Sequence, residues 1–163
     1  MSACLLLLVV KLIIEVMNRN KNLPIMLSVS SREAPQFHQS GILHQQSDQT
    51  LCNELVRLGG TVSELLEIDE MRKIILSTMR TDYSLIERWK LSSHQKIPCH
   101  ICAFIGCDDP DVNEEQAKGW EVWSETGFTL DVFSGGHFYF NQRLQILIQK
   151  LISHLRQIMQ KTI

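Results

Sequence analysis

Apolar and polar positions along the chain follow two different periods, and the changes between them predict strands that alternate with helices. Short apolar runs rich in β-prone residues and bounded by polar turns predict strands at 23–31, 99–106 and 128–133. The first segment, 1–16, is apolar at almost every position, which is typical of a helix buried on most of its surface. Such a helix needs a sheet to cover, and no strand precedes it in this chain.

Helical periodicity dominates the middle of the chain. Between 51 and 89, apolar residues recur three and four positions apart, and Gly59-Gly60 interrupts the pattern. Thr61 and Glu64 have the spacing of a capping box that would start the next helix. We therefore expect a helical block of roughly forty residues between the first and second strands.

Two more helices follow the second and third strands. The segment 114–125 places Ala117, Trp120 and Trp123 on one face, where the indoles most simply anchor a core, and Asn113 or Asp111 can cap its start. A final amphipathic helix is marked by Leu144, Leu147, Leu151, Leu155 and Ile158. This alternation predicts an α/β fold with a parallel sheet, and an insertion above the carboxyl ends of its strands commonly caps a ligand site.

Composition narrows the class of protein. The chain has 163 residues, 44% of them hydrophobic and 21% charged, which fits one globular domain. A net charge of -2 without a basic run argues against nucleic-acid binding. Lys11 interrupts an amino-terminal apolar run that is shorter than the roughly 20 residues of a membrane span, so we expect no membrane insertion.

The five cysteines form no evident disulfide framework, and their odd number favours a reducing, cytoplasmic setting. The motif CHIC, Cys99 to Cys102, has the spacing of a metal or redox site. It lies on a predicted strand, however, where an odd offset points the two sulfurs to opposite faces. We expect both thiols to be buried as small hydrophobic side chains.

Two polar residues stand where active residues of parallel sheets are found, in the loops after successive strands. Asp109 lies in GCDDPDV and His137 in SGGHFYF, separated by one predicted helix and one strand. A carboxylate that accepts from imidazole Nδ1 leaves Nε2 as a general base, and this order of acid and base is that of an α/β-hydrolase triad. Asp108 and Asp111 compete with Asp109, but we expect Asp108 to be solvated and Asp111 to be a cap.

The other histidines show no metal-ligand spacing, and we expect surface positions for them: His38, His44, His94, His100 and His154.

At these motifs the chain resembles the type II thioesterases of nonribosomal peptide and polyketide assembly lines and their medium-chain fatty-acyl relative. The resemblance rests on five stretches in the expected order along nearly the whole chain: SSREAPQ, LVRLGGTVSELL, MRTDYSLIE, GCDDPDV followed by WEVW, and FSGGHFYF. It implies an α/β-hydrolase fold, a triad acid at Asp109 and a triad base at His137. It also implies a lid at about 51–89, a carrier protein with a phosphopantetheine arm as partner, and no metal or cofactor.

The resemblance also sets expectations about the amino-terminal part. Family members carry a G-x-S-x-G elbow, preceded by further strands and an oxyanion loop, and on this alignment Met1 follows the nucleophilic serine. A shift of one or a few residues would instead set Ser2 near that position. We therefore expect a single incomplete domain at 1–163, monomeric, poorly soluble on its own and inactive without the missing half.

Two other functions remain open at this point. One is a non-catalytic module that binds carrier proteins, and the other is an esterase or lipase of the same fold that acts on small esters. Within the lid, helix packing and an acyl channel explain the apolar periodicity equally well at Leu65, Leu66, Ile74, Ile75 and Met79.

Overall fold

The computed structural model describes residues 13, 15–17, 23–59, 63–89 and 95–161 of the chain. Ile13 and residues 15–17 are helical; Ile13 is 5% exposed, Glu15 is exposed, and Val16 and Met17 are half-buried. The rest of the helix predicted at 1–16 lies outside the described residues. So do the alternative nucleophile Ser2, the capping residue Thr61 and His94.

Three parallel strands form the sheet, in the order β1, β2, β3 within the described part of the chain. Strand β1 spans Met26–Ser30, β2 spans His100–Gly106 and β3 spans Phe128–Phe133. Each strand is paired with its neighbour along its length. Six of the seven residues of β2 are buried, as expected of a central strand that is covered on both faces. The predicted α/β fold with a parallel sheet is therefore confirmed.

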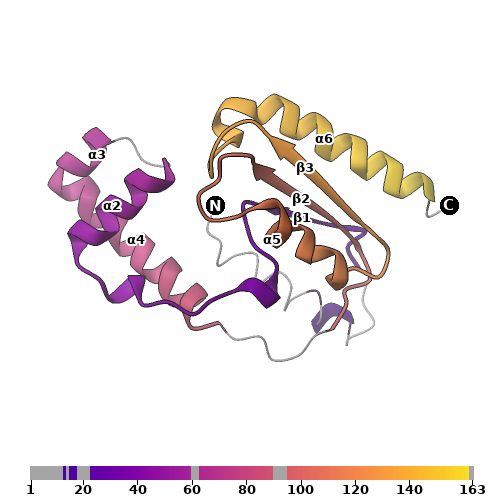
Figure 1. Cartoon of the computed structure of the whole chain (residues 1–163), viewed down its shortest axis with the longest axis horizontal. Helices are drawn as coiled ribbons and strands as arrows, with labels where there is room; N and C mark the ends of the chain where they lie inside the picture. Colours follow the sequence, from indigo (N-terminus) through magenta and orange to yellow (C-terminus); the bar gives the residue numbers. More distant parts are fainter. Residues whose placement is uncertain (1–12, 14, 18–22, 60–62, 90–94, 162–163) are drawn as a thin grey trace.

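Helices cover both faces of this sheet (Figure 1). Helix α5 (Glu114–Lys118) and a following 3-10 turn (Gly119–Trp123) cover one face, and helix α6 (Phe140–Lys161) covers the other. Side chains of β2 point alternately to the two faces of the sheet. Ile101 packs in the core with the 3-10 turn, and Phe104 packs in the core with α6.

The CHIC cysteines divide in the same way, as predicted. Cys99 belongs to the core under the 3-10 turn Gly119–Trp123, and Cys102 belongs to the core under α6. Burial raises the pKa of each thiol to about 11. Both thiols are therefore protonated at neutral pH, as expected of small buried side chains.

The helix predicted at 114–125 is shorter than expected. It is α-helical only to Lys118 and then tightens to the 3-10 turn, in which side chains three positions apart lie in line. Trp120 and Trp123 consequently face the core together and are 0% and 1% exposed. Their indole N–H groups donate to Arg32 O at 3.0 Å and Gln36 Oε1 at 2.7 Å, which ties this turn to the segment after β1.

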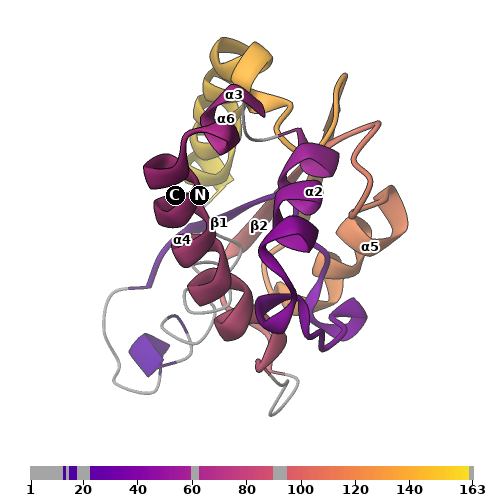
Figure 2. The same ribbon diagram turned by 90° about the vertical axis from the view of Figure 1, so that its left-hand side faces the viewer.

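The helical block between β1 and β2 follows a short 3-10 turn (Pro35–Phe37) and consists of a second one (Leu43–Gln45) and three helices. The helices are α2 (Asp48–Leu58), α3 (Ser63–Glu67) and α4 (Asp69–Glu87), so the predicted helical content is confirmed. Gly59 ends α2 at φ 72°, a left-handed conformation that favours glycine. Figures 1 and 2 show the block standing beyond the sheet, at the end toward which the strands point.

Within the described residues, no helix is both long enough and apolar enough to cross a membrane.

Candidate active site

The loops after β2 and β3 are bound directly to each other at the carboxyl end of the sheet. The Asp108 N–H donates to Gly135 O at 3.0 Å, and the Cys107 N–H donates to Phe133 O at 2.8 Å. Gly106, the last residue of β2, allows this approach, because a Cβ atom there would lie only 2.2 Å from Gly135 O. The pairing of the strands therefore brings their polar loops together.

This arrangement places His137 against Asp109. Imidazole Nδ1 lies 3.1 Å from both carboxylate oxygens and hydrogen-bonds Oδ1, which confirms the predicted contact. The Asp109 side chain is 0% exposed, whereas that of His137 is 21% exposed. Backbone N–H groups of Asp111 and Val112 also donate to Oδ1, at 2.9 and 3.3 Å.

The surroundings of Asp109 favour its ionised form. Burial acts to raise the pKa of this carboxyl group, but hydrogen bonds from the His137 side chain and the Asp111 N–H outweigh it and hold the pKa below its ordinary value. A carboxylate that accepts from Nδ1 fixes the tautomer that leaves a lone pair on Nε2. Nε2 hydrogen-bonds no residue in the described part of the chain, so it is available to a substrate or nucleophile.

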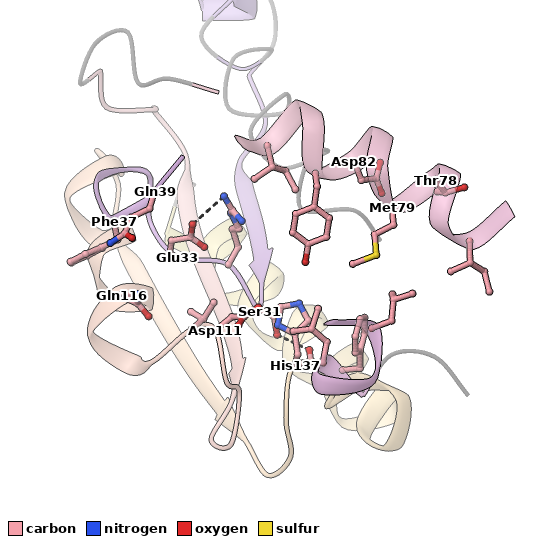
Figure 3. Close-up of a pocket in the computed structure, with 18 of the residues that line it drawn as sticks. Ser31, Glu33, Phe37, Gln39, Thr78, Met79, Asp82, Asp111, Gln116 and His137 are labelled. Atoms are coloured by element: carbon pink, nitrogen blue, oxygen red, sulfur yellow. Dashed lines mark hydrogen bonds and ion pairs between the residues drawn. The ribbon is translucent and has the colours of Figure 1, made fainter. Parts of the chain in front are cut away.

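His137 borders a pocket of about 780 Å³ between the strand loops and the helical block. In Figure 3, Glu33, Gln39 and Gln116 lie on one side of His137 and Met79 on the other. Helices α2 and α4 contribute most of the apolar wall: Leu55, Leu58, Ile74, Ile75, Met79 and Ile86.

Only some of the residues predicted to line an acyl channel lie at the pocket. Ile74, Ile75 and Met79 line the pocket, but Leu65 and Leu66 do not. Leu66 is 8% exposed and Leu65 is 38% exposed. Helical periodicity alone does not show which turn of a helix faces a cavity.

Asp108 and Asp111 do not take the place of Asp109. Asp108 is exposed, as expected, and accepts from Cys107 Sγ at 3.3 Å. The prediction that Asp111 is a cap is wrong, because Asn113 caps α5 in a reciprocal box with Gln116. Asp111 instead forms an ion pair with Arg57 of α2 at 2.5 Å, which links the helical block to the loop of Asp109.

The predicted surface positions of the other histidines are also wrong where they are described. The side chains of His38, His44 and His154 are 7%, 10% and 13% exposed. His38 contacts Arg32 and Glu33, and His44 contacts Glu87. His154 contacts Asp131, and His100 contacts Thr129. No group of three or more His, Cys, Asp or Glu residues is placed to hold a metal among the described residues. These histidines are polar packing residues, and the partners of His44, His100 and His154 are distant in sequence, which a sequence pattern cannot reveal.

Sequence reasoning did not identify three polar residues of the site. Ser31, directly after β1, is 6% exposed and donates through Oγ to the His137 backbone carbonyl at 2.8 Å. Arg32 and Tyr83 line the pocket, and burial is the main cause that lowers the pKa of Arg32 and raises that of Tyr83 to about 12. Two sequence signals could have drawn attention to Ser31: its position at a strand end and its place in the stretch SSREAPQ.

Comparisons with known proteins show what this chain is similar to. Residues 16–157 match the family model of the thioesterase domain. Thioesterase PikA5 of Streptomyces venezuelae is 31% identical over 129 residues, which cover 79% of this chain and 46% of that protein. The gramicidin S biosynthesis protein GrsT of Aneurinibacillus migulanus is 28% identical over 137 residues, which cover 83% of this chain and 54% of that protein. The chain thus spans about half the length of these curated relatives.

Solved structures show the same fold. The type II thioesterase BorB from the borrelidin biosynthetic cluster is 32% identical, with a TM-score of 0.80 over 92% of this chain and 61% of that one. RedJ, a thioesterase of the prodiginine pathway in Streptomyces coelicolor, is 23% identical and has a TM-score of 0.82 over 96% of this chain and 61% of that one. The expected α/β-hydrolase fold is confirmed over the matched part of these structures.

Proposed function

Since this chain belongs to the thioesterase family, in its type II branch, we propose that it acts in the hydrolysis of acyl or aminoacyl thioesters held on the phosphopantetheine arm of a carrier protein. The pathway would be nonribosomal peptide or polyketide biosynthesis. The relative GrsT is a gramicidin S biosynthesis protein, and BorB comes from the borrelidin biosynthetic cluster. His137 and Asp109 would supply the base and the acid of the triad.

The contact between His137 Nδ1 and the buried Asp109 carboxylate is the observation that carries this proposal. It orients the imidazole, leaves Nε2 as the proton acceptor and places it at the edge of a pocket of about 780 Å³. The Asp109 carboxylate is held ionised. A carboxyl group must be ionised to stabilise an imidazolium.

In this mechanism, Nε2 accepts the proton of a serine hydroxyl as its oxygen attacks the thioester carbonyl. As the tetrahedral intermediate collapses, the C–S bond breaks and Nε2 gives that proton to the pantetheine sulfur, which leaves an acyl-serine and a neutral imidazole. The same Nε2 then accepts a proton from water as the water oxygen attacks the acyl-serine, and it returns this proton to the serine oxygen when the acid is released. Ser2, the alternative position for the serine in this chain, lies outside the described residues.

The helical block would serve as the lid over the acyl group. Its α2 and α4 residues form the apolar wall beside His137, which suits an aliphatic chain. The ion pair between Arg57 and Asp111 would hold this lid near the loop of Asp109. Glu33, Gln39 and Gln116, on the other side of His137, offer polar contacts that suit the amides of the pantetheine arm.

A hybrid protein gives the sharpest test. The amino-terminal part of a type II relative, with its G-x-S-x-G elbow, is joined ahead of this chain, and acyl release is measured with three substrates. These are an acyl-loaded carrier protein, the corresponding acyl-pantetheine, and a p-nitrophenyl ester of the same acyl group. We expect the carrier-bound thioester to have the highest kcat/KM, and we expect the 163-residue chain alone to release no acyl group.

The other outcomes separate the competing functions. Equal or faster turnover of the oxygen ester, without a gain from the carrier, would indicate an esterase. Carrier binding by the hybrid without any turnover would indicate a non-catalytic module. Turnover by the 163-residue chain that is lost in Ser2→Ala would show that Ser2 is the nucleophile and would contradict its expected inactivity.

A further inference from the structure

Ser31 has a backbone conformation that is unusual for a serine. Its φ is 47°, and it is the only non-glycine residue with positive φ in the described part of the chain. Side chains disfavour this region, so a residue is kept there only when its surroundings fix it. The Ser31 N–H donates to Phe104 O at 2.9 Å, which anchors it to β2. This strained conformation turns the hydroxyl toward the loop of His137 (Figure 3).

The hydroxyl reaches the backbone of that loop directly. Ser31 Oγ donates to His137 O at 2.8 Å, across the carboxyl ends of two strands that are not neighbours in the sheet. Ser31 is 6% exposed, so water competes little for this hydrogen bond. The bond fixes the backbone from which the imidazole extends.

Asp109 has an unfilled position on the same network. Its Oδ1 accepts from His137, Asp111 and Val112. The buried Oδ2 also lies 3.1 Å from His137 Nδ1 but accepts no hydrogen bond among the described residues. Burial acts to raise the pKa of Asp109, while His137, the Asp111 N–H and, as the weakest of these influences, the Ser31 hydroxyl lower it. The Ser31 hydroxyl, whose direct hydrogen bond is to His137 O, thus also favours the ionised carboxylate.

We propose that Ser31 is a positioning residue of the pair formed by His137 and Asp109. Its single proton, which can rotate about the C–O bond, is shared between the His137 carbonyl and the unpartnered Oδ2 of Asp109. It fixes the imidazole from one side and completes the hydrogen-bonding of the carboxylate from the other. The consequence for catalysis rests on the proposed thioesterase function, but the hydrogen-bonded arrangement does not.

Three variants test this proposal. Ser31→Ala removes the hydroxyl and keeps the strained backbone, whereas Ser31→Gly removes the hydroxyl and relieves the strain, so it should fold at least as well as the parent. Ser30→Ala is the matched control, because it removes the neighbouring hydroxyl, which hydrogen-bonds Tyr139 Oη at 2.9 Å. Each is made in the 163-residue chain, fused to a small solubility tag.

The readout is the titration of the Asp109 carboxyl carbon, followed by NMR. Loss of a donor to the Asp109 carboxylate should raise its pKa, which corresponds to an acid dissociation constant about tenfold lower, in both Ser31 variants. Ser30→Ala should leave the Asp109 titration unchanged. An unchanged Asp109 titration in Ser31→Gly, or an equal change in Ser30→Ala, would overturn the proposal.

Turnover gives an independent arm in the hybrid protein. We expect Ser31→Gly to lower kcat by about 10-fold to 100-fold with KM unchanged, because a misplaced base affects the chemical step. A hybrid without turnover would count against the thioesterase function, while the Asp109 titration would still decide the role of Ser31.

Discussion

At the scale of single residues, Gly106 controls how closely the two polar loops approach. A Cβ atom at this position would lie 2.2 Å from Gly135 O and 2.3 Å from Gly136 O, so the loop of His137 would have to move. We predict that Gly106→Ala lowers the free energy of unfolding by about 1–3 kcal/mol and breaks the contact of His137 with Asp109. Urea unfolding and the NMR signal of the Nδ1 proton measure the two effects.

Gly136→Ala is the matched control for this substitution. A Cβ atom there would meet only Asp108 O, at an ordinary distance of 3.7 Å. If Gly106→Ala proves as harmless as Gly136→Ala, close approach of the loops is not what positions His137.

The triad candidates were predictable at this scale, but the residues that support them were not. Asp109 and His137 each follow a recognisable strand, and the loops of adjacent parallel strands meet at one edge of a sheet. The contribution of Ser31 depends on its φ and on a hydrogen bond to a loop far along the chain. Neither property is encoded in a local pattern. The predicted surface positions of the histidines were wrong for the same reason.

At the scale of elements, α4 is expected to set the length of the acyl group. Ile75 and Met79 line the apolar wall of the pocket, so a larger side chain there should shorten the space beside His137. We predict that Ile75→Trp and Met79→Trp in the hybrid shift the preference toward shorter acyl chains. The measurement is kcat/KM over a series of acyl-loaded carrier proteins.

Leu65→Trp serves as the control for this series. Leu65 lies on α3, is 38% exposed and does not line the pocket, so the same indole should leave chain-length preference unchanged. An identical preference in all three variants and the parent would place the acyl group outside this pocket.

A second prediction at this scale concerns the attachment of α6 to the sheet. Asp131 of β3 accepts from Lys150 Nζ at 2.7 Å and from His154 Nε2 at 2.5 Å, and its side chain is 14% exposed. Burial acts to raise the pKa of Asp131, but the hydrogen bonds from Lys150 and His154 outweigh it and hold the pKa below the ordinary 3.8. The stability gained by ionising Asp131 is therefore complete above pH 3.8 and is lost as the pH falls through the folded-state pKa.

Asp131→Asn should accordingly lower the free energy of unfolding by about 1–3 kcal/mol at pH 7, the contribution of hydrogen bonds to a charged group. The difference from the parent chain should shrink below pH 4, as measured by urea unfolding across the acid range. Asp108→Asn, at an exposed position, should show no comparable loss. A difference that stays constant with pH would show that shape, not charge, holds α6 at this point.

Elements were the most predictable level of the structure. Strand β3 was predicted to the residue, and Gly59 ends α2 because glycine adopts the left-handed conformation easily. The end of α5 was not predictable, because the 3-10 turn forms so that Trp120 and Trp123 share one side of a core built from distant strands. Local periodicity predicts that a helix exists better than it predicts where tertiary packing ends it.

At the scale of the whole molecule, an apolar stripe on α6 faces outward. Five residues at helical spacing are 36% to 55% exposed: Leu144, Ile148, Ile152, Leu155 and Met159. A contiguous exposed apolar surface favours association. We therefore predict that the 163-residue chain self-associates, as measured by light scattering on a size-exclusion column.

Replacement of Ile148 and Ile152 by lysine should reduce this association without unfolding the chain, because both side chains point away from the core that contains Leu147 and Leu151. Single-copy elution of the parent chain at high concentration would contradict the prediction. The sequence predicted the helix, and Leu147, Leu151 and Ile158 face the core as expected, but Leu144 and Leu155, which were predicted on the same face, lie on the exposed stripe.

The central claim is that Asp109 orients His137 for proton transfer in thioester hydrolysis. The most direct test is the kcat for acyl release from a loaded carrier protein by the hybrid, compared between the parent and Asp109→Asn. An asparagine keeps the shape but favours the wrong imidazole tautomer, so we predict a fall in kcat on the order of 10⁴ with KM and the thermal midpoint unchanged. A kcat within about tenfold of the parent, in a variant that folds normally, would contradict the claim.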